Sequence, residues 1–311
     1  MPEDTTGLVE VEEAGAPPAA DDTPRWRRTA RLVVSNRLAA AGLLILLVLV
    51  VVAFTDRWLA PYGYNEIDVV EGQLKPPSPS NLFGTDNIGR DVFSRVLLGA
   101  RVSLQVGAVA VGIALTLGTA VGVMAGYFGG KVDDLLMRAM DVLFAFPAIL
   151  MAIAVLAILG RGTTNAMIAI GIVYTPIFAR VSRASTLSVR EAVYVRAARS
   201  AGASDLRIMR LHILPNIAAP IIVQASISLA FAILAEAALS FLGLGTQAPD
   251  PSWGRMLSEG RGFFQQAWWM AVFPGVAIFL TVFSLNVVGD ALRDALDPRQ
   301  ASAMESRGLK A

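Results

Sequence analysis

The sequence predicts an all-α membrane protein with six transmembrane helices, and two observations about charge support this. Only 16% of the 311 residues are charged, whereas about a quarter are charged in a typical soluble domain. The charged residues also leave six uncharged runs, each at or above the roughly 17–25 residues that a helix needs to cross a bilayer. Six such runs argue against a soluble helical core. The runs are residues 38–54, 102–130, 142–160, 162–179, 213–235 and 262–289.

The distribution of basic residues predicts the orientation. If the N-terminus is cytoplasmic, the intracellular segments hold 18 of the 26 Lys and Arg residues. Basic residues are enriched in cytoplasmic loops. We therefore expect a multi-pass protein of the bacterial cytoplasmic (inner) membrane with both termini in the cytoplasm. The chain has no Cys, so disulfides and thiolate metal sites are not available to it.

The N-terminal part is predicted to be a tail followed by an anchored helix. Residues 1–24 are rich in Glu, Asp, Ala, Pro and Thr and hold no aromatic residue, a composition typical of disorder. We expect a disordered cytoplasmic tail over residues 1–30, then the first transmembrane helix and an extracytoplasmic loop over residues 31–100. Thr55-Asp56-Arg57-Trp58 does not resemble a signal-peptide cleavage site, so the helix is expected to be retained.

The first extracytoplasmic loop is expected to be largely irregular. The proline cluster Pro76, Pro77 and Pro79 interrupts regular structure. Farther along, residues 92–98 could form a short amphipathic helix at the surface.

Four residues outside the membrane allow two interpretations. Asp86, Arg90 and Asp91 could form part of a docking surface for another protein, or they could fold their loop through local ion pairs. We prefer the second interpretation. Trp253, in the loop before the sixth helix, invites the same two interpretations.

The second transmembrane helix contains a ladder of small residues, Ala114, Gly118, Gly122 and Gly126, at intervals of four. Small residues at this spacing leave a groove on one helix face, so a neighbouring backbone can approach closely. We favour packing within the chain over dimerisation, because polytopic proteins use such ladders inside their cores.

The third helix follows a tight turn at Gly129-Gly130-Lys131 and is expected to be broken early by Pro147. Near its start, Arg138 and Asp141 are three residues apart. We expect them to form an ion pair on one helix face. A short link at residues 161–164 then leads to the fourth helix.

The fifth helix is predicted to begin after Pro215 and to run to about Leu242. Glu236 lies near its outer end, and an intramembrane carboxylate is a candidate functional group. A hydrogen-bonded structural role is the alternative. We assign Glu236, Met151, Gln224 and Ser228 to a candidate translocation path or gate, although methionines more often fill irregular gaps in a core. Trp268 and Trp269 are expected to start the sixth helix at the membrane interface.

The segment between the fourth and fifth helices is predicted to be a cytoplasmic helix–turn–helix. Tyr194, Ala197, Ala198 and Ala201 recur at i, i+3, i+4 and i+7, so they form one face of a helix. Gly202 then interrupts the pattern and is expected to allow a special backbone conformation or a close approach. A face of small side chains suits docking into a protein groove better than insertion into lipid, where bulky residues are usual.

The second helix of this segment is expected to start at a cap from Ser204 or Asp205. Its apolar stripe is predicted to be Leu206, Met209 and Ile213. Leu214-Pro215 ends it. His212 has no other His in the chain, so a metal site is not expected there and the ring should pack or hydrogen-bond beside Pro215.

The residues "YVRAARSAGASDLRIMRLHILPN" resemble the EAA loop of the inner-membrane permease subunits of binding-protein-dependent ABC importers. The family pattern is Glu-Ala-Ala, three residues, Gly, nine residues and Ile-x-Leu-Pro. It fits residues 196–198, Gly202 and residues 212–215, with Arg196 in place of the acid and His212 in place of the first Ile. Both departures resemble the dipeptide/oligopeptide/nickel branch, as do the stretches Phe83–Leu104, Ile233–Leu257 and Gly289–Arg299. The closest likeness is to the C-type subunit.

The resemblance implies a type I importer with a non-catalytic permease core over residues 101–298, an EAA-type loop over residues 187–216 and a cytoplasmic tail over residues 299–311. It implies a heterodimer with a B-type permease, two cytoplasmic ATPases that bind ATP and Mg, and an extracytoplasmic binding protein. No cofactor or metal is expected on this chain. Membrane lipid surrounds it, and nucleic acid is not a partner. The substrate would be di- or oligopeptides.

Residue roles also follow from the resemblance. ATPase coupling is expected at Tyr194, Arg196, Ala197, Ala198, Ala201, Gly202, Leu214 and Pro215. In the docking alternative for Asp86, Arg90, Asp91 and Trp253, the partner would be the binding protein. Gly202→Asp is expected to leave the helices inserted but to lower substrate-stimulated ATP hydrolysis. Nickel or haem as cargo, a secondary transporter and a membrane-anchored scaffold remain alternatives.

Overall fold

The computed structural model of the chain describes residues 25–67 and 72–296. Within these residues the protein is built from helices and irregular connections, with no β-strand. The helices are α1 (Arg25–Ser35), α2 (Arg37–Leu59), α3 (Val92–Phe128), α4 (Gly130–Phe144), α5 (Ala148–Leu159), α6 (Thr163–Arg190), α7 (Val193–Ser200), α8 (Asp205–Ile208), α9 (Ala218–Phe241), α10 (Trp253–Gly260) and α11 (Trp269–Leu296). A π-helix (Met209–Ile213) and a 3₁₀ turn (Leu214–Ile217) join α8 to α9, and another 3₁₀ turn (Arg261–Phe263) follows α10.

Among the described residues, five helical segments are long and apolar enough to cross a membrane. They are α2, α3, α6, the continuous stretch Asp205–Phe241, and α11. The third predicted span corresponds to the pair α4 and α5, which is bent by 93° and is the remaining candidate span. Pro147 lies at that break, where its ring prevents continuation of the preceding helix, so the expected interruption is confirmed.

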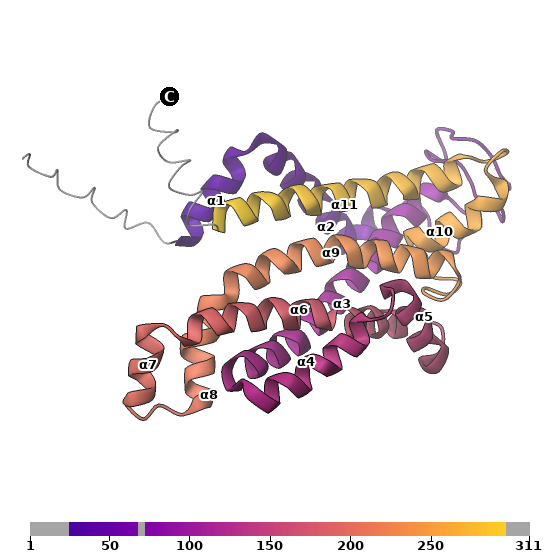
Figure 1. Cartoon of the computed structure of the whole chain (residues 1–311). Coiled ribbons are helices and arrows are strands. Elements are labelled where there is room, and N and C mark those ends of the chain that lie inside the picture. The colour runs from indigo at the N-terminus through magenta and orange to yellow at the C-terminus, as the bar shows by residue number, and fades with distance from the viewer. Residues whose placement is uncertain (1–24, 68–71, 297–311) are drawn as a thin grey trace, which may run out of the picture.

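The helices give the molecule two distinct ends (Figure 1). The helices α1, α7 and α8 lie at one end, together with the C-terminal end of α11. The short helix α10 lies at the opposite end. We refer to these as the α7 end and the α10 end.

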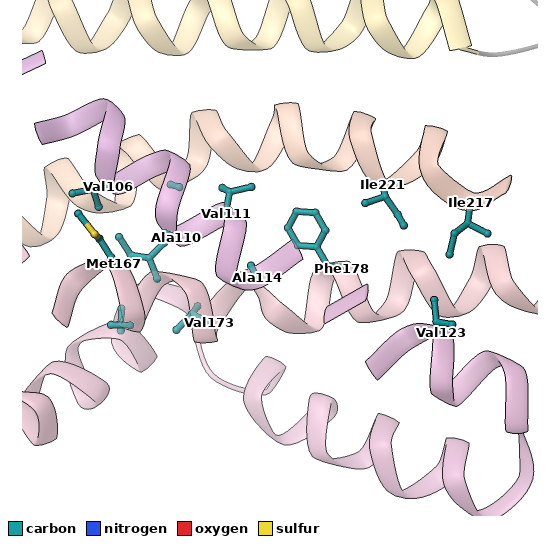
Figure 2. Close-up of a cluster of buried hydrophobic side chains, with 14 of the residues drawn as sticks. Val106, Ala110, Val111, Ala114, Val123, Met167, Val173, Phe178, Ile217 and Ile221 are labelled. Carbon is teal, nitrogen blue, oxygen red and sulfur yellow. The ribbon is translucent and has the colours of Figure 1, made fainter. Parts of the chain in front are cut away.

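The core is formed mainly by α3, α6 and the start of α9. Val106, Ala110 and Ala114 of α3 pack with Phe178 of α6 and Ile221 of α9 in one buried cluster (Figure 2). Small and branched side chains dominate it, which lets the helix axes approach closely.

The predicted ladder of small residues packs within the chain. A Cβ atom placed on Gly118 would lie 2.5 Å from the carbonyl oxygen of Thr175, and one on Gly122 would overlap the carbonyl oxygen of Ala179. The partner helix is therefore α6, in direct backbone contact with α3. This confirms the interpretation that the ladder serves intramolecular packing.

Two local predictions about helix positions are wrong. Residues 92–98 are not a separate surface helix; they form the first turns of α3, with Val92 and Val96 buried. Residues 25–30 belong to helix α1 and not to a disordered tail. Residues 1–24 and 299–311 lie outside the described residues.

The predicted Arg138–Asp141 pair is replaced by a pair between helices. Asp141 of α4 accepts a hydrogen bond from Arg180 of α6 at 2.7 Å. The guanidinium of Arg180 also lies 4.0 Å from the ring centroid of Phe144. Asp141 thus pairs with Arg180 of the neighbouring helix α6 and not with Arg138 of its own helix.

Candidate functional site

The helix–turn–helix segment, residues 191–216, projects at the α7 end (Figure 1). Its first helix, α7, is held to the rest of the protein by Val195, which is fully buried. At 100° per residue, Ala197 and Ala201 lie on the side of α7 opposite Val195. Both are exposed, as are Tyr194 and Arg196, whereas Ala198 is half-buried against the core. The segment therefore presents a face of small side chains outward.

The turn depends on Gly202, whose φ is +81°. Residues with a Cβ rarely adopt this left-handed region. Its amide donates to the carbonyl of Arg199 at 3.0 Å, and the amide of Ala203 donates to the carbonyl of Ala198 at 3.1 Å. No atom beyond its neighbours lies within 4 Å of a Cβ placed on Gly202. Of the two expected roles, backbone conformation applies and close approach does not.

The second half of the segment differs from the predicted apolar stripe. Ile208 and Ile213 are fully buried, whereas Leu206 is exposed. The reason is the π-helix over Met209–Ile213, which places residues five apart on one face in place of residues three or four apart. Ser204 occupies the N-cap position of α8 without a side-chain cap hydrogen bond.

The end of the segment leads directly into α9. Leu214 and Pro215 are exposed and lie in the 3₁₀ turn that precedes it. The side chain of Asn216 donates to the carbonyl of His212 at 2.7 Å, and the His212 ring lies 6.4 Å from that of Tyr194. The hydrogen bond near Pro215 is thus made by the backbone of His212, and the ring of His212 lies near Tyr194.

At the α10 end, a cluster of buried and partly buried ionic residues joins the first loop to α3 and α10. The carboxylate of Glu259 accepts hydrogen bonds from Arg90 at 3.0 Å, from Arg95 at 2.8 Å and from Arg255 at 2.9 Å. Asp86 pairs with Arg90 at 2.6 Å. These contacts bring together residues far apart in the sequence, and we call them the Glu259 cluster.

This geometry contradicts the docking role predicted for four residues. Asp86, Arg90, Asp91 and Trp253 are each at most 5% exposed, so their side chains offer no surface to another protein. Asp91 instead caps α3 by accepting from the amide of Ser94 at 2.7 Å. The indole of Trp253 donates to the carbonyl of Val96 at 3.0 Å. The preferred alternative, in which the charged residues fold the loop, agrees with these contacts.

The aromatic residues at the start of α11 behave differently from each other. Trp269 is buried and its indole donates to the carbonyl of Thr85 at 3.0 Å. Trp268 is 46% exposed. Only Trp268 has the exposure expected of a residue at a membrane interface.

Glu236 is buried in a hydrogen-bonded position. Its carboxylate accepts from Ser240 at 2.7 Å and from Ser103 of α3 at 3.3 Å. Ser103 in turn accepts from the amide of Trp253 at 3.3 Å. Glu236 therefore links α9, α3 and α10, which matches the structural alternative for this residue.

The other candidate path residues are not gathered around Glu236. Gln224 donates to Ser228 at 3.1 Å within α9, and Met151 of α5 packs against the main core. A cavity of about 420 Å³ opens between α5, α6 and α9, but none of the four predicted path residues lines it. Its walls include Ile149, Ala152, Tyr174, Phe231 and Leu234, and no charged residue.

Sequence reasoning missed two sets of contacts. Glu259 stands in no recognisable motif, and its partner Arg95 lies 164 positions away. Similarly, Tyr127 at the end of α3 hydrogen-bonds to Asp205 across 78 positions. A charged residue inside an otherwise apolar helix, such as Arg95, was the available signal that a buried partner exists.

Comparison with known proteins identifies matching families. Residues 118–302 match the family described as the binding-protein-dependent transport system inner membrane component. Residues 24–77 match the N-terminal TM domain of oligopeptide transport permease C.

Individual relatives cover nearly the whole chain. The dipeptide transport system permease protein of Alkalihalophilus pseudofirmus is 47% identical over 93% of this chain and 96% of its own length. A glutathione transport system permease protein of Escherichia coli is 47% identical over 88% of this chain and 89% of its own length. A solved structure of the MetNI methionine ABC transporter in an inward-facing conformation shares the fold, with a TM-score of 0.54 and 17% identity, covering 65% of this chain and 96% of that one.

Proposed function

The chain belongs to the family of binding-protein-dependent transport system inner membrane components, and on this basis we propose that it is the C-type permease subunit of an ATP-driven importer of di- and oligopeptides. The observation that carries the proposal is the near full-length match to permeases of dipeptide and glutathione transport systems. The match to the N-terminal domain of an oligopeptide permease supports the C-type assignment.

The proposed orientation has both termini and the helix–turn–helix segment in the cytoplasm. The excess of basic residues on these segments supports it. The fold is consistent with it, because α1, α7 and the end of α11 lie at the same end of the molecule (Figure 1). The Glu259 cluster and α10 would then face the extracytoplasmic side.

In the proposed mechanism, α7 docks into a groove of a cytoplasmic ATPase. The exposed Ala197 and Ala201 allow a close approach because they add little bulk to the helix surface. Tyr194 and Arg196 border this face, and Leu214 and Pro215 connect the segment to α9. When the two ATPases close on ATP and Mg, α7 moves with them. Because α7 follows α6 directly and leads through α8 and the π-helix into α9, both transmembrane helices follow.

The remaining partners follow from the same proposal. A B-type permease would complete the path, and an extracytoplasmic binding protein would deliver the substrate. The chemistry of ATP hydrolysis belongs to the ATPases, so this chain contributes conformational change and no catalytic group.

The cavity between α5, α6 and α9 suits the passage of peptides with varied side chains. Its apolar walls lack charged residues, so no fixed charge would select for one peptide sequence. Discrimination among substrates would then occur at the binding protein.

The proposed ATPase contact is tested by changing the size of one side chain on α7. Ala197→Trp should block docking, because an indole cannot enter a groove shaped for a methyl group. We expect at least about a tenfold loss of binding-protein-stimulated ATP hydrolysis, because loss of a central interface contact costs about 2 kcal/mol or more. The matched control is Ala197→Ser at the same position, which should retain most of the activity.

The assay uses the complete complex of both permeases, both ATPases and the binding protein in proteoliposomes. Co-purification of the ATPases with each variant is measured alongside hydrolysis. If Ala197→Trp retains both the ATPases and stimulated hydrolysis at the level of Ala197→Ser, α7 is not the docking helix.

A further inference from the structure

Tyr127 lies in the last turn of α3, where it contacts both helices of the helix–turn–helix segment. Its side chain is buried, and its hydroxyl donates to the Oδ1 atom of Asp205 at 2.6 Å. The guanidinium carbon of Arg199, at the end of α7, lies 5.3 Å from the centroid of its ring. Hydrogen bonding to Tyr127 also raises the pKa of Arg199 above its ordinary value. We call these three residues the Tyr127 cluster.

The Gly202 turn brings both charged partners to the same tyrosine, with Arg199 over its ring and Asp205 at its hydroxyl. Arg199 lies in the last turn of α7 and Asp205 begins α8, so the chain must reverse between them. The positive φ of Gly202 permits this reversal. A tyrosine suits the position, because its face attracts a cation and its hydroxyl donates to a carboxylate.

The same end of α3 is also fixed to α6. Arg190 of α6 donates to the carbonyl of Gly126 at 2.7 Å, one residue before Tyr127. Arg183 of α6 forms a two-point contact with the carboxylate of Asp133 in α4. The end of α3, the start of α4 and the end of α6 therefore form one packed unit.

The opposite end of α3 reaches the α10 end of the molecule. The helix has 37 residues without a break, which corresponds to about 55 Å at 1.5 Å per residue. There Arg95 binds Glu259 and Ser103 binds Glu236. One continuous helix thus connects the Tyr127 cluster to the Glu259 cluster.

We propose that the Tyr127 cluster fastens α3 to the helix–turn–helix segment, so that α3 carries the movement of α7 to the α10 end of the protein. The covalent chain connects the helix–turn–helix segment only to α6 and α9. The Tyr127 cluster adds polar contacts between this segment and α3. Tyr127 is a positioning residue in this proposal. The proposal rests on the proposed function, since it needs a partner that moves α7.

The first test compares Tyr127→Phe and Asp205→Asn, singly and together, in the complete complex in proteoliposomes. Tyr127→Phe removes the hydrogen bond, whereas Asp205→Asn replaces its charged acceptor by a neutral one. Neither change removes bulk. We expect ATP hydrolysis to persist while dipeptide uptake per ATP falls at least about fivefold, because a hydrogen bond to a charged group is lost. The double variant should resemble the single variants, since both remove one shared interaction.

Tyr64→Phe is the matched control. Tyr64 lies at the α10 end, and its contact with Arg95 uses the backbone carbonyl, not the hydroxyl. Its uptake per ATP should equal that of the unchanged protein. A parallel fall of hydrolysis and uptake in the Tyr127 and Asp205 variants, or an unchanged ratio, would overturn the proposal. If the complex without any substitution shows no ATP-dependent uptake, the proposed function itself is refuted.

A second measurement keeps the test valid if Tyr127→Phe does not fold. The chain has no native Cys, so spin labels can be attached at Lys131→Cys and Leu206→Cys, two exposed positions on either side of the cluster. The distance between the labels should stay constant between nucleotide-free and ATP-bound complexes. A distance that changes with nucleotide in this otherwise unaltered chain would show that α3 does not follow the segment.

Discussion

Gly122→Ala is expected to destabilise the protein by about 3 kcal/mol or more, the upper range for overpacking a well-packed core. The added Cβ would overlap the carbonyl oxygen of Ala179 and lie 2.8 Å from the Cβ of Ser182. Backbone atoms cannot rotate away as a side chain can, so α3 and α6 would have to separate. Thermal unfolding of the purified complex and its yield in membranes would measure the effect.

Gly112→Ala on the same helix is the matched control. Nothing lies within 4 Å of a Cβ at Gly112, and alanine favours a helix over glycine by up to about 1 kcal/mol. We expect this variant to be neutral or slightly more stable. If both variants unfolded at the same temperature, close backbone contact between α3 and α6 would be refuted.

Glu259→Gln is the second change with a large expected effect. It leaves Arg95, whose side chain is 1% exposed, without its closest carboxylate, because the remaining contact to Asp86 is 3.8 Å long. Removing one partner of a buried ion pair costs about 3–5 kcal/mol, since the other charge stays buried without compensation. The free energy of unfolding in denaturant, measured on the purified complex, should fall by this amount.

Asp141→Asn tests the contrast with an exposed pair. The Arg180–Asp141 side chains are 44% and 61% exposed, and exposed ion pairs contribute about 0–1 kcal/mol. A loss at Asp141 equal to the loss at Glu259 would show that burial of the Glu259 cluster does not determine its contribution.

Local sequence patterns predicted the elements but not their partners. The runs of uncharged residues located the spans, and the spacing of Gly118, Gly122 and Gly126 predicted close packing. Neither pattern could identify α6 as the packing partner, because the ladder describes the surface of α3 and not the surface that packs against it. The break at Pro147 was predictable, whereas its angle of 93° depends on the surrounding helices.

The errors have the same physical origin. Arg138 and Asp141 have suitable helical spacing, yet Asp141 pairs with Arg180 on another helix. Leu206 was expected to be buried with Ile213, but the π-helix changes the repeat and buries Ile208 instead. Asp86 and Arg90 were candidates for docking, but they are buried, because Arg90 pairs both with Asp86 and with the distant Glu259.

The central claim is that this permease moves peptides only when ATPases drive it, and uptake of a labelled dipeptide tests this most directly. The complex of this chain, a B-type permease, both ATPases and the binding protein would be reconstituted in proteoliposomes. We predict uptake that requires both ATP and the binding protein, and that unlabelled dipeptides inhibit by competition. Uptake that proceeds equally without ATP would contradict the account.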